Sequence, residues 1–360
     1  MKIIHVIGSL EIGGAEKLLI DLLPELKNKK IDLSLLVIGS GNPFFVKSLE
    51  HKGVKVILLN KSNIYNPFNI FKIFNLLKNY KYIHVHLFPA LYYVAFVKIF
   101  DSSKILFYTE HNTHNKRRDI WFLKYLEIFL YSRYYKIISI SLYTQINLKK
   151  WLSINDEFER FCVIGNGVNI KKYSSASPTF LKQSFNKRII LMVSRFSEQK
   201  DHTTLIKAFK IVTNKRKDVH LFLVGEGKTL GDMRKIVEDN LLGSDVTFLG
   251  ARNDVPNLMA LSDIGVQSSK WEGFGLTAVE FMASGTPVIA SDVKGLSEVV
   301  QDGGILFKQG NYKDLAKIIL RLMDDACFYR EISIKAYKKS QLYSCDKMAN
   351  YYYDLYKEFL

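Results

Sequence analysis

The chain has 360 residues, of which 48% are apolar and 13% aromatic. This length exceeds one comfortable hydrophobic core, so two domains of near-equal size are expected, with ample apolar material for both. No apolar run is long enough to span a bilayer, and the first residues lack the pattern of a secretory signal peptide. The cysteines are few and widely spaced, which favours a reducing cytoplasm and argues against a disulfide framework or a zinc site: Cys162, Cys327 and Cys345.

The net charge of +16 is unevenly distributed along the chain. Residues 1–172 contain 25 Lys/Arg and 13 Asp/Glu, about +12, which leaves about +4 for the rest. A basic half can meet nucleic acid, anionic lipid or an acidic substrate. The usual nucleic-acid-binding motifs are absent from the sequence, so no nucleic-acid partner is expected and an anionic membrane surface is favoured.

The first apolar strand, 2–10, is followed by two adjacent glycines and then by a segment with apolar residues at helical spacing, 15–27. A strand, a glycine loop and a helix N-terminus together can form a phosphate-binding turn. Gly13 and Gly14 are therefore candidate ligand contacts. Their spacing differs from the dinucleotide-binding fingerprint, and many tight turns look alike.

Strands and helices continue to alternate through the first half of the chain. Strands are expected at 31–39, 54–60, 82–88, 104–110 and 136–141, and helices near 43–52, 67–79, 89–100, 119–134 and 142–152. Nearly continuous apolar strands that alternate with helices predict a doubly wound, mostly parallel sheet. Ligands of such sheets bind beyond the carboxyl ends of the strands, so the loops at those ends are candidate site loops.

The most polar of these loops is 109–118, which contains one acid, three cations and two imidazoles, His111 and His114. His111 lies nearer the strand end and is the candidate for acceptor chemistry or phosphate contact, because histidine can donate, accept or carry charge near neutral pH. The alternative is a histidine that only satisfies loop backbone. For His84 and His86, at the end of the preceding strand, a structural role is favoured.

Three predicted helical segments combine aromatic residues with lysines: 67–82, 92–98 and 119–136. Such helices can lie on anionic lipid with their aromatic rings at the level of the headgroups. Buried core helices also contain Leu and Phe, so core packing is the alternative. The pattern favours membrane docking by the first half of the chain.

A polar, serine-rich stretch, 173–179, is the best linker in the sequence, and the domain boundary is placed there. The alternation then restarts, with strands expected at 188–194, 219–224, 246–250, 264–268, 287–292 and 305–308. Arg195 and Lys200 lie in the loop that leaves the first of these strands, where two cations can neutralise a diphosphate. A solvated loop is the alternative.

The stretch 270–280 places two carboxylates, Glu272 and Glu280, on either side of a Gly-Phe-Gly turn that enters a helix. The glycines let backbone N–H groups approach a ligand, and the N-terminus of a helix favours phosphate. Ionised carboxylates accept hydrogen bonds from sugar hydroxyls. A nucleotide sugar requires this combination of phosphate-binding amides and hydroxyl-binding carboxylates. The alternative interpretation of the stretch is a helix that begins with glycine and carries one exposed acid.

Several motifs, in chain order, resemble those of the retaining GT-B glycosyltransferases of family 4, the glycosyl transferases group 1. They are Gly13-Gly14-Ala15-Glu16, Asn166-Gly167-Val168-Asn169, Val193-Ser194-Arg195 with Gln199-Lys200, Leu223-Val224-Gly225-Glu226-Gly227, and Glu272-Gly273-Phe274-Gly275-Leu276 through Glu280. The loop 109–112, with the basic run after it, resembles members that act in bacterial capsule, O-antigen or exopolysaccharide assembly.

The resemblance implies two Rossmann-like domains that face each other across a cleft. Residues 1–172 would form the acceptor-binding domain, on which the C-terminal helix, about 345–360, packs back. Residues 173–344 would form the nucleotide-sugar-binding domain. Carried over by position, Glu280 would bind the ribose hydroxyls and Glu272 the hydroxyls of the sugar.

The same resemblance assigns the remaining contacts. The backbone of Gly273–Leu276 would reach sugar and phosphate, while Arg195 and Lys200 neutralise the diphosphate. Gly13 and Gly14 would bring backbone of the first domain to the phosphates. His111 would lie by the reacting sugar, and Arg252 near the base.

The implied reaction is transfer from a nucleotide sugar, with UDP favoured and GDP open, to a lipid-linked or growing saccharide. Cations and helix N-termini at the leaving group would stabilise its developing charge. No Asp-X-Asp follows a predicted strand, so neither a metal nor another cofactor is expected. The protein is expected at the inner face of the cytoplasmic membrane. A nucleotide-sugar epimerase on the same fold and a non-catalytic basic module that binds membrane or polyanion are the alternatives.

Overall fold

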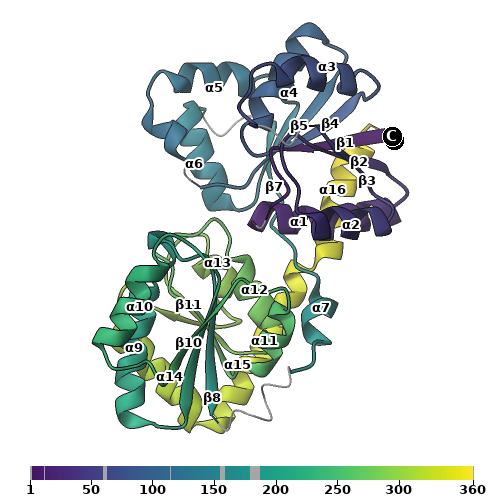
Figure 1. The fold of residues 1–360 in the computed structure, drawn as a ribbon. Coiled ribbons are helices and arrows are strands. Elements are labelled where there is room, and N and C mark those ends of the chain that lie inside the picture. Colours follow the sequence, from purple (N-terminus) through teal and green to yellow (C-terminus); the bar gives the residue numbers. More distant parts are fainter. Residues whose placement is uncertain are drawn as a thin grey trace. The chain divides into compact units, whose positions relative to one another are not determined.

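The computed structural model describes residues 2–11, 13–59, 63–113, 115–154, 159–178 and 187–359. Residues 60, 114, 179 and 360, which belong to the elements and loops expected above, lie outside the described residues. The chain forms two compact units. The first contains residues 1–167 and 345–360, and the second contains residues 168–344 (Figure 1).

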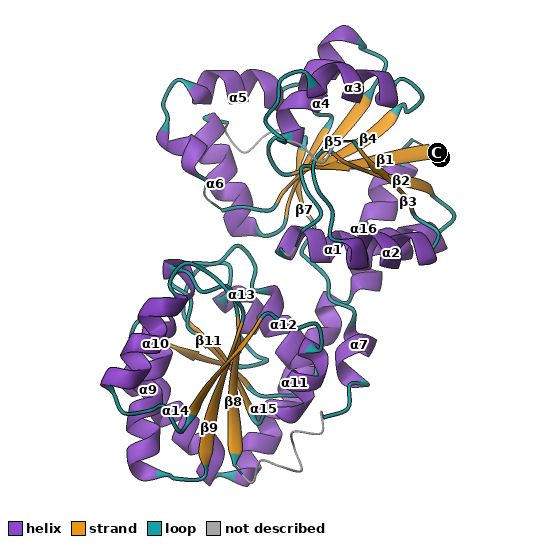
Figure 2. Ribbon diagram, viewed as in Figure 1, coloured by secondary structure: helices purple, strands orange, loops and turns teal. Residues whose placement is uncertain are grey.

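The first unit is a seven-strand parallel sheet in the order β3-β2-β1-β4-β5-β6-β7, counted over the described residues. Its helices lie on both faces, with α3, α4 and α5 on one and α1, α2 and α16 on the other (Figure 2). The strands are β1 (Lys2–Ile7), β2 (Asp32–Val37), β3 (Lys55–Leu58), β4 (Tyr82–His86), β5 (Ile105–Glu110), β6 (Lys136–Ser139) and β7 (Phe161–Val163). The helices are α1 (Gly14–Asn28), α2 (Pro43–His51), α3 (Asn69–Leu77), α4 (Ala90–Phe100), η1 (Lys116–Asp119), α5 (Leu123–Tyr131), α6 (Leu142–Leu152) and α16 (Cys345–Lys357).

The second unit is a parallel sheet whose six described strands have the order β10-β9-β8-β11-β12-β13. The strands are β8 (Arg188–Val193), β9 (Val219–Val224), β10 (Val246–Gly250), β11 (Ile264–Gln267), β12 (Val288–Ser291) and β13 (Ile305–Phe307). The helices are α7 (Ile170–Ser174), η2 (Glu198–Lys200), α9 (His202–Lys215), α10 (Leu230–Asp239), α11 (Val255–Leu261), α12 (Leu276–Ala283), α13 (Ser297–Val300), α14 (Tyr312–Asp324), α15 (Ala326–Ser340) and η3 (Gln341–Tyr343).

Both sheets are buried on both faces, which explains why their strands are almost continuously apolar. In each sheet the chain starts near the centre, adds strands toward one edge, and then returns to the centre to build the other edge. The order therefore reverses between β1 and β4 in the first unit, and between β8 and β11 in the second. In open parallel sheets, ligands bind beyond the carboxyl ends of the strands at such a reversal point.

The doubly wound architecture confirms the predicted fold class, but two boundaries differ from the expectation. The first unit ends at Gly167 rather than at residue 172, because α7 packs against α11 and α12 of the second unit. The predicted helix 119–134 is interrupted: η1 ends at Asp119, and α5 begins only at Leu123. Amphipathic patterning alone does not reveal such a break.

Candidate nucleotide-sugar site

The loops that follow β8 and β11 are adjacent, because these two strands are neighbours at the reversal point of the second sheet. Several hydrogen bonds join the loops. The backbone N–H of Lys270 donates to the carbonyl of Gln199 at 2.7 Å, and the Gln199 side-chain amide donates to the carbonyl of Trp271 at 2.9 Å. The two motifs that the sequence places 70 residues apart therefore form one structural unit.

Lys200 and Glu272 form an ion pair between these loops. The Ser269 hydroxyl also donates at 2.9 Å to Oε1 of Glu272, the oxygen that Lys200 contacts. Two donors therefore hold the carboxylate of Glu272 in one position. Glu272 is only 8% exposed, so its surroundings are mostly desolvated. The sequence placed both residues in the site but did not predict that they contact each other.

The turn between Glu272 and α12 depends on two glycines with positive φ. Gly275 has φ +91°, and a Cβ there would lie 2.4 Å from Leu296 Cδ1. Gly295 has φ +84°, and a Cβ there would lie 2.5 Å from the carbonyl oxygen of Glu272. The first N–H groups of a helix have no partner within it, so this turn brings backbone donors to the site. Phe274 anchors the turn by packing edge-on against Tyr343.

The remaining predicted residues of this unit differ in burial and in their position along the sheet. Glu280 lies on α12 and is buried, whereas Arg195 is exposed two residues after β8. Arg252 follows β10, which lies two strands from β8, and its guanidinium donates twice to Asp254, at 2.8 and 2.7 Å. Arg195 thus belongs to the same strand-end loop as Lys200, whereas Arg252 lies nearer the edge of the sheet.

Gly225 and Gly227, to which the sequence analysis assigned no separate role, lie in the loop that follows β9. A Cβ on Gly225 would lie 2.0 Å from the carbonyl oxygen of Ser194, and one on Gly227 would lie 2.1 Å from that of Phe196. The loop after β9 therefore packs directly on the backbone that flanks Arg195. The Gly-X-Gly spacing in the sequence indicates a close backbone contact at these two residues. Which segment they contact could not be identified without the order of the strands in the sheet.

In the first unit, Gly13 and Gly14 follow β1 at the other reversal point, and α1 begins at Gly14. His111 follows β5, and its Nε2 lies 3.1 Å from Nδ1 of His86. The sequence therefore identified the strand-end position of these three residues. It did not identify the contact of His111 with His86.

The cations near His111 have structural partners. Buried Glu110 accepts hydrogen bonds from Tyr131 and Arg118, at 3.1 and 3.2 Å. Arg117 pairs with Glu127 at 2.8 Å. Two of the three cations of this loop are therefore paired, Arg118 with Glu110 of β5 and Arg117 with Glu127 of α5. This leaves His111 as the better candidate for contact with a substrate.

Among the described residues, one group has potential metal-ligand atoms within 4.8 Å of one another: His5, His84 and His86. All three are fully buried. Nδ1 of His5 and Nε2 of His86 are already hydrogen-bonded to each other at 2.9 Å, and the rings of His84 and His86 are stacked 4.5 Å apart. Parallel, mutually bonded rings fit a hydrogen-bonded chain better than a shared ion.

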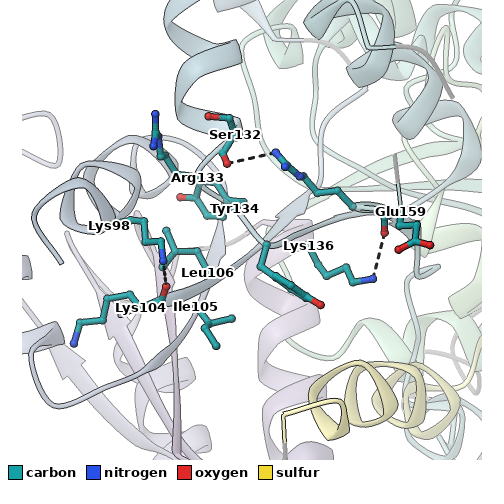
Figure 3. A pocket seen from close by; sticks show the side chains of 11 residues that line it. Lys98, Lys104, Ile105, Leu106, Ser132, Arg133, Tyr134, Lys136 and Glu159 are labelled. Carbon is teal, nitrogen blue, oxygen red and sulfur yellow. Dashed lines mark hydrogen bonds between the residues drawn. The ribbon is translucent and has the colours of Figure 1, made fainter. Parts of the chain in front are cut away.

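A cavity of about 560 Å³ lies elsewhere, at the amino ends of β5 and β6 (Figure 3). Five of its lining residues are cations. The four cations that Figure 3 labels point in different directions. Four of the five donate to backbone carbonyls: Lys98 to that of Lys104, Lys104 to that of Lys78, Lys136 to that of Glu159 and Arg160 to that of Ser132. This cavity is at the wrong edge of the sheet for the predicted ligand, so we do not assign the site to it.

Comparison with known proteins agrees with this geometry. The family model described as Glycosyltransferase Family 4 matches residues 12–172, and the model described as Glycosyl transferases group 1 matches residues 179–339. Together the two models span most of the chain. Their boundary falls close to the division between the two structural units.

Two relatives and one solved structure illustrate the match. N-acetyl-alpha-D-glucosaminyl L-malate synthase of Bacillus anthracis is 30% identical over 54% of this chain and 53% of its own length. The UDP-Gal:alpha-D-GlcNAc-diphosphoundecaprenol alpha-1,3-galactosyltransferase of Escherichia coli is 25% identical over 90% of this chain and 88% of its own. The crystal structure of Anabaena HepE in complex with UDP-glucose superposes with a TM-score of 0.86 at 25% identity, covering 100% of both chains.

Other matches are shorter or show the fold alone. Poly(glycerol-phosphate) alpha-glucosyltransferase of Bacillus subtilis is 26% identical, and the match covers 32% of its length. The matched segment thus spans about half of the Bacillus anthracis relative and about a third of the Bacillus subtilis relative. A glycosyltransferase structure from Rickettsia africae has a TM-score of 0.80 at 21% identity, with 99% of this chain covered.

Proposed function

Because the chain belongs to the family 4, or group 1, glycosyltransferases and has their GT-B fold, we propose that it is a retaining, metal-independent hexosyltransferase. The proposed donor is a nucleotide sugar, with UDP as the favoured carrier. The proposed acceptor is a lipid-linked or growing saccharide of bacterial capsule, O-antigen or exopolysaccharide synthesis. No other cofactor takes part in the proposed reaction.

The observation that carries the proposal is the joined pair of loops at the carboxyl ends of β8 and β11. They bring the cations Arg195 and Lys200, the carboxylate of Glu272 and the N-terminus of α12 to one reversal point. This is the chemistry that a sugar diphosphate requires, since cations and amides bind phosphate while carboxylates accept from hydroxyls. The HepE structure supports UDP-glucose as a first donor to test, because that protein was crystallised with it.

In the proposed reaction, the bond from the anomeric carbon to the phosphate oxygen breaks, and Arg195 and Lys200 stabilise the departing diphosphate. The acceptor hydroxyl attacks from the same face and passes its proton to the departing oxygen, so the configuration is retained. Lys200 would exchange part of its contact with Glu272 for the phosphate, which frees Glu272 to accept from sugar hydroxyls. Glu280 is assigned to the ribose, Arg252 to the base, and Gly13, Gly14 and His111 to the phosphate and sugar.

Membrane docking is the second part of the proposal. None of the described helices is both long and apolar enough to cross a bilayer. However, Trp121, Tyr125 and Phe129, spaced four residues apart, are all exposed, and Glu127 anchors the other side of α5 by accepting from Arg117 and other donors. Exposed aromatics of this kind beside lysines suit the headgroup region of an anionic membrane. Further exposed aromatics lie just before α3, on α3 and at the end of α4: Phe68, Phe71 and Phe100.

Product analysis tests the proposed activity. The full-length protein is incubated with UDP-glucose and other nucleotide sugars, with and without undecaprenyl-diphosphate-linked acceptors, and the products are identified by mass spectrometry and NMR. The proposal predicts an acceptor-dependent glycoside whose anomeric configuration matches that of the donor. A changed sugar without acceptor would identify an epimerase, and the absence of both turnover and nucleotide binding would favour a non-catalytic module.

A further inference from the structure

Three imidazoles form a continuous hydrogen-bonded chain in the first unit. Nδ1 of His5 lies 2.9 Å from Nε2 of His86, and Nδ1 of His86 lies 3.1 Å from Nε2 of His111. His5 and His86 are fully buried, whereas His111 is partly exposed at the end of β5. The chain therefore runs from the core between β1 and β4 to the predicted site loop, and it leaves Nδ1 of His111 as the nitrogen not used within the chain.

All three rings are neutral near physiological pH. Burial lowers the pKa of His5 and of His111 to about 3. Burial, followed by the charges of the neighbouring histidines, holds the pKa of His86 well below its ordinary range. A neutral imidazole has one N–H and one lone pair, so each ring of the chain can donate once.

This limit leaves two proton arrangements for the chain. In the first, His5 donates to His86 and His86 donates to His111, so His111 carries its proton on Nδ1. In the second, every donor is reversed, so His111 presents a bare Nδ1 and His5 places its proton on Nε2. Nε2 of His5 is buried and has no hydrogen-bond partner among the residues that the structure describes.

The unpartnered nitrogen of His5 discriminates between the two arrangements. Buried N–H groups without an acceptor are rarer in proteins than buried acceptors without a full set of donors. The first arrangement places a lone pair at this position, whereas the second places an orphaned N–H there. We propose that His86 and His5 are positioning residues that hold His111 in the Nδ1–H tautomer, so that His111 presents a hydrogen-bond donor to an oxygen of the substrate.

A second network keeps the rings of the chain in place. His84 stacks on His86 with ring centroids 4.5 Å apart, and its Nε2 lies 2.7 Å from the Thr109 hydroxyl. That hydroxyl contacts the Tyr352 hydroxyl of α16 at 3.1 Å, and the other nitrogen of His84 is bonded to Tyr356. The C-terminal helix therefore buttresses His84, the ring that stacks on His86.

The tautomer can be measured without any turnover. In the full-length protein labelled with ¹⁵N at histidine, long-range ¹H–¹⁵N spectra distinguish a protonated ring nitrogen from a bare one. We expect a protonated Nδ1 and a bare Nε2 for His111, assigned by the loss of its signals in His111→Ala. A protonated Nε2 on His111 in the unsubstituted protein would overturn the proposal.

Two amide substitutions of His86 form a matched pair. The amide of Asn lies near the position of Nδ1 and can still donate to His111, whereas the amide of Gln lies near that of Nε2 and reaches only His5. His86→Asn should therefore retain the Nδ1–H signal of His111, and His86→Gln should lose it. An identical His111 tautomer in both variants would show that His86 does not set it.

Steady-state kinetics provide a second test, which rests on the proposed transferase function. The tautomer spectra do not depend on that function. His86→Gln should lower kcat by about tenfold, as the loss of partners that orient a reactive group often does, with KM for the donor little changed. In a His111→Ala background the same substitution should have no further effect, because its effect passes through His111. An equal loss of kcat in both backgrounds, with a matching loss of thermal stability, would assign His86 to structure alone.

Discussion

The two units contain polar networks of opposite character. The network of the second unit is charged and lies at the strand ends, where Lys200 and Glu272 pair across adjacent loops. The network of the first unit is neutral and runs through the core, from His5 through His86 to His111. Charged groups at a partly exposed edge can exchange their partners for a charged ligand, whereas buried neutral rings are suited to holding an orientation.

Substitutions in the two networks should therefore affect different properties of the protein. In the second unit, loss of a charged side chain should weaken contact with the donor directly and leave the fold intact. In the first unit, loss of a buried ring should act through its neighbours and should also appear in stability. The following predictions test this division, from the largest expected effect to the smallest.

Replacing Arg195 or Glu280 with alanine should have the largest effect. Each variant should lose on the order of 3 kcal/mol of transition-state stabilisation, or more than 100-fold in kcat/KM for the nucleotide sugar. Lys235→Ala, which removes an exposed cation on α10, is the control and should leave the rate unchanged. Steady-state kinetics with a saturating acceptor provide the measurement, and near-normal rates in both site variants would remove these residues from the mechanism.

The turn that enters α12 should tolerate substitution poorly. Gly275→Ala places a Cβ 2.4 Å from Leu296 Cδ1 at φ +91°, and should cost about 2 kcal/mol of the free energy of unfolding, together with donor affinity. Gly243→Ala is the matched control, because its Cβ meets nothing within 4 Å. Urea unfolding and nucleotide titration of both variants make the comparison. Equal behaviour of the two variants would show that the turn is not constrained.

The neutral histidines of the first unit should make stability depend on pH. The folded pKa of His5 is about 3, below the ordinary value of about 6.5 for an unfolded chain. The unfolded state therefore binds more protons between these values, so the free energy of unfolding should fall as the pH is lowered through this window. The slope for one such group is about 1.4 kcal/mol per pH unit.

Urea unfolding at pH 6.5 and pH 5.0 measures this dependence. Other groups also titrate in this range, so the informative quantity is the difference between the unsubstituted protein and His5→Gln. The variant should show a shallower loss of stability over the same interval. Parallel pH profiles would mean that His5 is not a buried neutral group.

Removing one exposed aromatic should have the smallest effect, and only on membrane association. Trp121→Ser should weaken binding to vesicles with anionic phosphatidylglycerol by about 1 kcal/mol, or roughly fivefold, because part of one large apolar side chain is lost from the interface. Leu241→Ser is the control, since Leu241 is 86% exposed in the second unit. Cosedimentation measures both, and equal binding by the two variants would contradict docking through α5.

The sequence predicted the charged network better than the neutral one for a physical reason. Glu272, Glu280 and the glycines between them form a local motif, and Arg195 and Lys200 follow a strand whose end is visible in the apolar pattern. Their assembly requires only that β8 and β11 be neighbours, as the doubly wound fold provides. The Lys200–Glu272 contact itself depends on loop geometry that no local pattern encodes.

The histidine chain depends on strand register instead. His5 pairs with His84 across β1 and β4, which places His5 and His86 on the same face of the sheet. The alternation of His84 and His86 was visible in the sequence, but their partners lie between 25 and 272 residues away along the chain. A one-residue change of register would turn these side chains to the opposite face. The sequence therefore favoured an isolated structural role for His86 and missed its contact with His111.

Thermal denaturation of the full-length protein with a panel of nucleotides tests the central claim most directly. UDP, UDP-glucose, UDP-galactose, GDP and GDP-mannose are each added to the unsubstituted protein and to Glu280→Ala, since a ligand that binds the native state raises its stability by mass action. We predict that at least one nucleotide sugar raises Tm of the unsubstituted protein, and that the shift is largely lost in Glu280→Ala. No shift with any nucleotide, or equal shifts in both proteins, would contradict the assignment of the β8 and β11 loops as a nucleotide-sugar site.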